Sequence, residues 1–334
     1  MTDSTQTRLN STRRTRIGVA VTFAALGDVE RQAVEEALRC AVSSAGNWEL
    51  VFANYGLTPI AGAMPGVDLL VYLGESSRFE SVAGALAQRV PVVFIKSTVE
   101  SLLDRPAGSA MRYRMSTGVL GIAQALAQAA PLAPTVDWTS LPWPAELAGL
   151  VHLDPGEQGY VDISLGTFRQ AAARRGITWT SGLPVNGKAF SVFLTMHDPA
   201  AARLADYALR TWAQCTVIAA DGMSSTAAPD GRPWPERLVR MRHWTAFSRS
   251  ASNERFRDLL GQPLPDIDSP GMLFGTLFFL DTLLGTGADP ACLEAAGRAL
   301  GPLGLLRLTA TGQPDPERVI LLRGRKWSVS KIHL

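Results

Sequence analysis

The sequence contains few lysines and cysteines, and it lacks any long apolar run. Only 4 of its 32 basic residues are lysine, the net charge is +2, and the arginines are spread along the chain beyond the basic first 16 residues. A surface that neutralises phosphates is therefore not expected, which argues against direct nucleic-acid binding. No stretch reaches about 18 uninterrupted apolar residues, so no membrane span is predicted.

The usual motifs of cofactor, nucleotide and metal sites are also missing. Cys40, Cys215 and Cys292 are far apart and odd in number, which argues against a disulfide framework or a zinc site and favours a reducing compartment. The turn TFAALGD has one glycine where a dinucleotide-binding turn needs three, and no P-loop sequence occurs. The four histidines are too scattered for metal-ligand spacing. Neither a cofactor nor a metal is expected.

The first residues could form either a tail or an export signal. Residues 1–16 are polar and basic and lead into the apolar segment 17–27, which superficially resembles a secretion signal with paired arginines. No convincing small-residue cleavage site follows, and Asp28 opens an amphipathic helix at once. We therefore expect a disordered tail over 1–15, a buried strand after it, and a cytoplasmic location, with an export signal in residues 1–27 as the alternative.

Short apolar segments alternate with amphipathic segments along the chain. This order predicts an α/β fold of two doubly wound, Rossmann-like lobes, with helices on both faces of each sheet. In the first half, strands are expected at 17–22, 48–53, 67–74 and 90–95, and helices at 28–45, 76–88 and 117–130. In the second half, strands are expected at 147–154, 190–196, 215–220, 305–309, 318–323 and 326–329, and helices at 159–175, 199–212, 252–260 and 270–285.

A segment rich in proline and tryptophan, 131–146, has too few periodic apolar positions for a regular element and marks the expected boundary between the lobes. The helix 270–285 is apolar nearly all round and must be buried, so its Phe274, Leu277, Phe278 and Leu280 are expected to be structural. The predicted organisation is a tail over 1–15, an N-terminal lobe over 16–130, a hinge over 131–146, a C-terminal lobe over 147–250, and returning helices with a terminal hairpin over 251–334.

Small polar residues follow several predicted strands. In open α/β sheets a ligand lies outside the carboxyl ends of the strands, where helix N-termini present unpaired N–H groups. These hydroxyls and amides suit a carboxylate or amide that is held without catalysis, although Ser76, Ser77 and Asp221 could equally be helix caps. The candidate ligand-binding residues are Thr22, Phe23, Ser76, Ser77, Ser97, Thr98, Tyr160 and Asp221.

The order of several segments resembles a known family. RIGVAVT is followed by the helix DVERQAVEEALRCAVSSAG, then by LLVYLGESS, VPVVFIKST, RYRMSTGVLGIAQALAQ and LVHLDPGEQGY. This order is similar to the type I periplasmic-binding-protein superfamily, particularly its branch of branched-chain amino acid, urea and amide binders, which includes cytoplasmic sensors and exported receptors. The resemblance implies that the turns at Ser76–Ser77 and Ser97–Thr98, together with Tyr160, touch the ligand. The segment GLTPIAGAMPG departs from the family, since it replaces most of a helix.

Three functions are compatible with these observations. The leading hypothesis is a cytoplasmic sensor or regulatory subunit that closes on a small polar ligand such as an amino acid or amide, which would be compatible with a regulatory protein partner and with a homodimer. An enzyme on the same scaffold is less favoured, and it would need two of Glu75, Lys96, Asp221 and His197 to face each other. The third function is an exported solute receptor of an ABC transporter.

Overall fold

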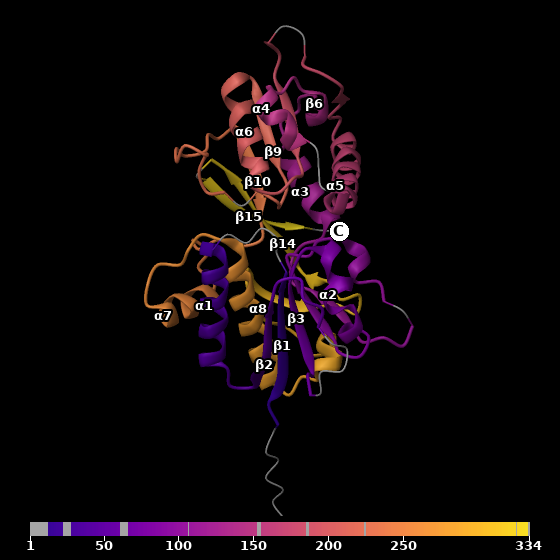
Figure 1. Ribbon diagram of the computed structural model, residues 1–334, viewed down its shortest axis with the longest axis vertical. Coiled ribbons are helices and arrows are strands. Elements are labelled where there is room, and N and C mark those ends of the chain that lie inside the picture. Colours follow the sequence, from indigo (N-terminus) through magenta and orange to yellow (C-terminus); the bar gives the residue numbers. More distant parts are fainter. Residues whose placement is uncertain are drawn as a thin grey trace, which may run out of the picture.

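The chain forms two α/β lobes that lie one above the other in Figure 1. In this computed structural model, the described residues are 13–22, 28–60, 66–105, 107–151, 155–184, 187–223, 225–324 and 326–332. The first 12 residues of the expected tail lie outside these ranges. The two-lobed α/β architecture predicted from the alternation of segments is confirmed.

The first lobe is built on a five-stranded parallel sheet in the order β2-β1-β3-β4-β5. Its strands are β1 (Thr15–Thr22), β2 (Trp48–Tyr55), β3 (Leu69–Gly74), β4 (Val92–Ile95) and β5 (Arg112–Arg114). Its helices are α1 (Asp28–Ser44), α2 (Phe79–Ala87), α7 (Ala251–Leu260) and α8 (Asp268–Gly285). One core cluster joins the sheet to α1, α7 and α8, and another joins it to α2, so helices cover both faces.

Helix α8 is the most deeply buried helix of this lobe, as its lack of a polar stripe predicts. Phe274 stacks on Phe256 of α7 with ring centroids 4.6 Å apart, and Leu277 and Leu280 are fully buried. Phe278 is only half-buried against the same core. No described helix of the chain is both long enough and apolar enough to cross a membrane.

The second lobe is built on a seven-stranded sheet in the order β15-β14-β10-β9-β8-β6-β7. The segment from β10 to β7 is parallel, whereas β14 and β15 run antiparallel. Its strands are β6 (Thr135–Val136), β7 (Trp179–Thr180), β8 (Phe190–Leu194), β9 (Cys215–Ala219), β10 (Leu238–Arg242), β14 (Glu317–Arg323) and β15 (Lys326–Ile332). Its main helices are α3 (Val119–Ala129), α5 (Pro155–Arg174) and α6 (Ala200–Thr211).

The chain crosses between the lobes three times within the described residues, and none of these crossings lies in 131–146, where the hinge was expected. Helix α3 packs on α5 and β14 of the second lobe, so the first crossing is 115–118. The second is 243–250, between β10 and α7, and the third lies at Pro316, between β13 (Pro314–Asp315) and β14. The segment 131–146 forms β6 and packs the buried Trp138 and Leu141 into the core of the second lobe. Its large apolar side chains are spaced irregularly, so they fill this core without showing the periodicity of a helix or a strand.

Most predicted elements lie within a few residues of the observed ones, but the expected strand 147–154 is wrong. Its described part forms the short helix α4 (Ala145–Ala148) and a single 3-10 turn (Gly149–Val151), and α5 begins at Pro155. Tyr160, which was expected at the start of a helix that follows a strand, therefore lies in the second turn of α5 instead. The sequence analysis also missed β10, whose buried residues include Arg240 and Arg242 and therefore do not read as an apolar strand.

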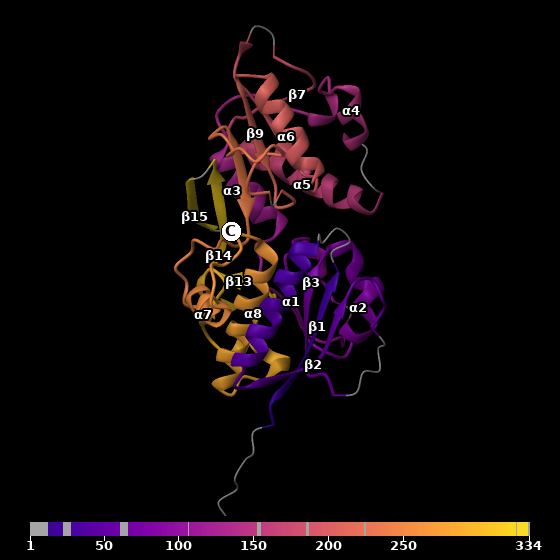
Figure 2. The ribbon, with the colours of Figure 1, turned by 60° about the vertical axis from the view of Figure 1, so that its left-hand side comes forward.

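The carboxyl ends of the parallel strands in the two sheets face each other. The carboxyl end of β5 leads directly to the second lobe, and the carboxyl end of β10 leads directly back to the first. The turns that follow β1, β3 and β4 therefore lie on the side of the first lobe that faces the second lobe. The turns after β8 and β9 lie opposite them, as can be followed in both Figure 1 and Figure 2. This interlobe region contains the candidate site.

Candidate ligand-binding site

Thr22 and Ser97 stabilise the first lobe's strand ends. The Thr22 side chain is fully buried, and its hydroxyl lies 2.5 Å from the Tyr72 hydroxyl, which donates to the carbonyl of Glu75 at 2.9 Å. The buried Ser97 hydroxyl donates to the carbonyl of Gly74 at 2.7 Å and so ties the end of β4 to the end of β3. Burial in this arrangement raises the pKa of Tyr72 well above its ordinary value. Both hydroxyls thus hold the turns in place.

Ser76 and Ser77 begin a single 3-10 turn (Ser76–Arg78) directly after β3. Ser76 is half-buried and Ser77 is exposed. The N-cap position of this turn is Glu75 and that of α2 is Arg78, so the alternative that the two serines are plain caps is wrong. Both residues follow the carboxyl end of the central strand β3, which is where ligands bind in open α/β sheets.

Thr98 is buried after β4, and its carbonyl accepts a hydrogen bond from Arg114 Nη1 at 3.1 Å. Lys96, two residues earlier, has a backbone φ of 62°, and it is the one non-glycine residue with positive φ in the described part of the chain. Its ammonium lies 3.4 Å from the Ser269 hydroxyl at the start of α8. Phe23, the remaining first-lobe candidate, falls outside the described residues.

In the second lobe, Tyr160 and Asp221 come together although 61 residues separate them. The Tyr160 hydroxyl donates to Asp221 Oδ1, and its ring stacks on His197 with centroids 5.7 Å apart. Tyr160 projects from α5, Asp221 follows β9 and His197 follows β8. The two second-lobe candidates thus lie together, with Tyr160 on α5 next to the carboxyl ends of the adjacent strands β8 and β9.

His243 completes this group and was not recognised in the sequence. Its Nε2 lies 3.3 Å from Asp221 Oδ2, and the side chains of His243 and Asp221 are 1% and 10% exposed. Burial alone would raise the pKa of Asp221, but the hydrogen bond and charge of His243, then the Tyr160 hydrogen bond and the His197 charge, lower it to about 2. Asp221 is therefore a buried, oriented anion at neutral pH.

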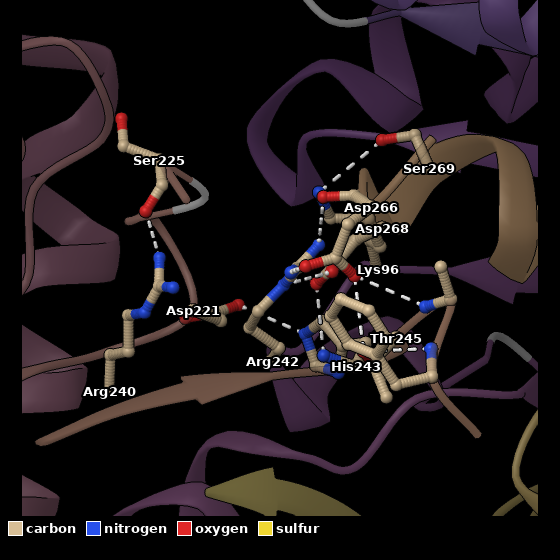
Figure 3. A network of polar contacts seen from close by, with 12 residues as sticks. Lys96, Asp221, Ser225, Arg240, Arg242, His243, Thr245, Asp266, Asp268 and Ser269 are labelled. Atoms are coloured by element: carbon tan, nitrogen blue, oxygen red, sulfur yellow. Dashed lines mark hydrogen bonds and ion pairs between the residues drawn. The ribbon is translucent and has the colours of Figure 1, made fainter. Parts of the chain in front are cut away.

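The neighbouring Arg242 anchors the second crossing to the first lobe. Its Nε lies 2.6 Å from Asp268 Oδ1 and its Nη1 lies 2.7 Å from Asp266 Oδ2, while Asp268 Oδ2 accepts the backbone N–H of His243 at 3.0 Å. Asp268 is the first residue of α8. Figure 3 shows these charged groups gathered between Asp221 on one side and Ser269 on the other. A polar network thus connects Asp221 of the second lobe to the first lobe through the crossing.

Another buried ion pair joins the other two crossings. Arg114, at the end of β5, lies 3.4 Å from Glu317 at the start of β14, and the two side chains are 1% and 5% exposed. Burial favours the neutral forms, so it lowers the pKa of Arg114 and raises that of Glu317. All three crossings are therefore held by buried charged groups.

A small cavity lies beneath Tyr160. It has a volume of about 10 Å³ and is lined mainly by α3, α5 and the ends of β8 and β9. The Ser164 hydroxyl on this lining is buried and has no hydrogen-bond partner in the described residues. The cavity has room for about one water molecule, not for a ligand.

Of the four groups proposed for an enzyme, Asp221 and His197 lie close together, and both contact Tyr160. Glu75 lies 3.5 Å from Arg78 in its own turn, and Lys96 contacts Ser269. Asp221 and His197 are close enough for the His197 charge to affect the pKa of Asp221. Four residues of the network were not recognised in the sequence: Arg242 ends β10 and His243 follows it, while Asp266 precedes α8 and Asp268 is its first residue. A signal for Arg242 and His243 was the segment LVRMRHW, in which alternating arginines mask a strand.

No protein-family model and no curated protein sequence matches the chain. Solved structures do match. An ABC transporter substrate-binding protein from Desulfitobacterium hafniense is 16% identical with a TM-score of 0.69, over 96% of this chain and 100% of that one. A solute-binding protein from Rhodopseudomonas palustris, in complex with p-hydroxybenzoic acid, is 13% identical with a TM-score of 0.66, over 96% and 98%.

A leucine-binding protein from Thermotoga maritima is 13% identical with a TM-score of 0.64, and the match spans 96% of this chain and 99% of that one. Because these matches extend over both lobes, the chain has the fold of the type I periplasmic binding proteins, as found in the solute-binding proteins of ABC transporters. The resemblance inferred from the order of the segments is confirmed at the level of the fold.

Proposed function

We propose that the protein binds a small polar molecule between its lobes, an amino acid or a related small carboxylic acid. The observation that carries this proposal is Asp221, a buried anion that Tyr160 and His243 orient at the carboxyl end of β9. A carboxylate in this position suits the ammonium group of an amino acid. The hydroxyl and N–H groups of the facing first-lobe turns suit a carboxylate.

An aromatic acid is the second ligand class that a specific observation supports. Tyr160 and His197 stack at an interplanar angle of 29° and offer a flat aromatic surface next to Asp221. The similar structures include one that is in complex with leucine and one that is in complex with p-hydroxybenzoic acid. Both classes of compound therefore belong in a binding screen.

The cellular role that best agrees with the similar structures is that of a solute receptor of an ABC transporter. The cytoplasmic sensor, which was the leading hypothesis from the sequence, has no support among these structures. The receptor role requires export, whereas the lack of a convincing cleavage site and the helix that opens at Asp28 favour a cytoplasmic location. Fractionation of cells that produce the full chain, with N-terminal sequencing of the product, distinguishes the two roles.

A thermal-shift screen of amino acids, aromatic acids, amides and ureas tests the proposal, because selective binding raises apparent stability by RT ln(1 + [L]/Kd). Titration calorimetry then compares Asp221→Asn and Tyr160→Phe with wild type. Tyr207→Phe is the matched control, since Tyr207 packs between Trp143 and Trp212 of the second lobe, on helix α6. We expect weaker binding in the first two variants only. Equal affinity in all four proteins would contradict the proposed site.

The enzyme hypothesis is tested with the same compounds. The contacts of Asp221 with Tyr160 and His243 would also suit proton transfer. After incubation with the protein, a bound ligand is recovered and its mass is compared with that of the starting compound. An unchanged ligand supports binding without turnover, and a converted ligand supports the enzyme.

A further inference from the structure

Lys96 has a backbone conformation that a lysine adopts at a cost. Its φ of 62° lies in the left-handed region, which glycine enters freely and a lysine rarely does. The residue stands at the carboxyl end of β4, immediately before the Ser97–Thr98 turn. Strained residues at such places persist when other contacts hold them. The contacts of the Lys96 side chain are therefore informative.

The Lys96 ammonium reaches from β4 to the N-terminus of α8. It lies 3.4 Å from the Ser269 hydroxyl, which in turn donates to Glu30 Oε1 of α1 at 2.5 Å. Burial alone would raise the pKa of Asp268, and the charges of Arg242 and then Lys96 lower it. Lys96 thus supplies positive charge to a carboxylate that is only 2% exposed.

Asp268 connects Lys96 to the crossing between the lobes. It accepts the backbone N–H of His243, and the imidazole of His243 contacts Asp221 in the second lobe. Figure 3 shows Lys96, Asp268 and His243 close together, with Asp221 beyond them. The path runs from the first-lobe turn to the second-lobe anion through Lys96, Asp268 and His243, so a change at one end alters the polar contacts along the path.

We propose that Lys96 is a positioning residue that couples the Ser97–Thr98 turn to the crossing at 243–250 and, through Asp268 and His243, to Asp221. Its backbone sets the direction of the turn, and its ammonium holds the turn against the N-terminus of α8, where Asp268 in turn holds the backbone of the crossing. The role of this coupling in ligand affinity rests on the proposed function. The coupling itself is a property of the ligand-free protein and is tested without a ligand.

The test separates the backbone of Lys96 from its ammonium. Lys96→Gly removes the ammonium but suits the left-handed conformation, whereas Lys96→Ala removes the ammonium and retains the strain. Lys188→Ala, at an exposed lysine of the second lobe, is the matched control. Spin labels on the exposed Cys292 of the first lobe and on Arg203→Cys in α6 report the interlobe distance by double electron–electron resonance, while Cys40 and Cys215 are buried.

We expect Lys96→Gly to unfold at the wild-type temperature or above it, and Lys96→Ala to unfold below it. Both variants should nevertheless broaden the interlobe distance distribution, and both should speed hydrogen exchange at the His243 amide by about tenfold. The control should leave all three measurements unchanged.

If Lys96 were merely structural, glycine would restore every property together. A wild-type distance distribution and wild-type His243 exchange in Lys96→Gly would therefore overturn the proposal. Because no ligand is used, that result leaves the binding screen as an independent test, so a failure of the coupling and a failure of the proposed function are distinguishable.

Discussion

The two lobes contribute chemically different halves to the interlobe region. In the first lobe, Thr22 and Ser97 form neutral hydrogen bonds within their own lobe and hold the strand ends. In the second lobe, Tyr160, Asp221 and His243 form a compact group around one buried charge. The Thr22 and Ser97 side chains of the first half therefore contribute neutral contacts, whereas the second half is built around a charged carboxylate.

This difference has a consequence for how each half responds to change. A neutral hydrogen bond contributes on the order of 1 kcal/mol to stability, whereas removing one partner of a buried charge leaves the other uncompensated at several times that cost. Charge substitutions and pH should therefore act mainly on the second half and on the crossing attached to it. Hydroxyl substitutions in the first half should have smaller effects that pH does not modify.

The largest effect is expected from Asp268→Asn at the crossing. The buried Arg242 then keeps only Asp266 as a charged partner, so we expect a loss of about 3 kcal/mol in the free energy of unfolding, measured by urea denaturation. Asp230→Asn is the control, because Asp230 also pairs with arginines but on the surface, where solvent screens the charges and we expect a much smaller loss. Similar losses in both variants would contradict the importance of burial.

The next effect concerns pH and Asp221. The pKa of its carboxyl is lowered from 3.8 to about 2 on folding, which corresponds to about 2 kcal/mol of stability at neutral pH. Because the folded pKa lies below the unfolded value, this stability is present above pH 4 or so and is lost as the pH falls toward 2. The free energy of unfolding, measured as a function of pH, should show this loss in wild type and in Ser97→Ala but not in Asp221→Asn. An unchanged acid profile in Asp221→Asn would refute the assignment.

The fold was largely predictable because its strands are short apolar runs between amphipathic helices. β1, β3, β4, β8 and β9 are buried almost throughout, so residue type alone marks them. β10 was not predicted because Arg240 and Arg242 interrupt its apolar sequence. Both arginines can be buried there because groups from other segments pair with them, the Ser225 carbonyl with Arg240 and the Asp268 carboxylate with Arg242. The boundary was misplaced because 131–146 packs through isolated large side chains, which carry no periodicity.

The site was predictable only in part, for a related reason. Tyr160 and Asp221 could be proposed because each lies near the end of a predicted strand or the start of a predicted helix. His243, Arg242 and Asp268 could not, because their role depends on a crossing whose position follows from three-dimensional packing. The left-handed backbone conformation of Lys96 likewise could not be predicted, since a lysine in the sequence does not indicate a positive φ as a glycine does.

A smaller effect on stability is expected from Ser97→Ala. The variant loses the hydrogen bond to the Gly74 carbonyl and leaves that acceptor buried, so we expect a loss of about 1 kcal/mol in urea denaturation. The loss should be the same at pH 7 and pH 5, since neither group titrates there. A loss that changes between these pH values would mean that the first half is coupled to a titrating group, and the contrast between the halves would fail.

The smallest effect on folding is expected from Ser77→Ala. The side chain is exposed, so the free energy of unfolding should stay within about 0.5 kcal/mol of wild type. Binding of the compound returned by the thermal screen should weaken, by about 0.5 to 1.5 kcal/mol if Ser77 contacts a neutral group and by about 1.5 to 3 kcal/mol if it holds a carboxylate. Ser81→Ala is the control in titration calorimetry, because that exposed hydroxyl bonds to the Arg78 carbonyl in the same lobe. If Ser77→Ala binds the compound as tightly as Ser81→Ala does, the first lobe holds its ligand through backbone N–H groups. The two lobes would then differ in that the first binds the ligand with its main chain and the second with its side chains.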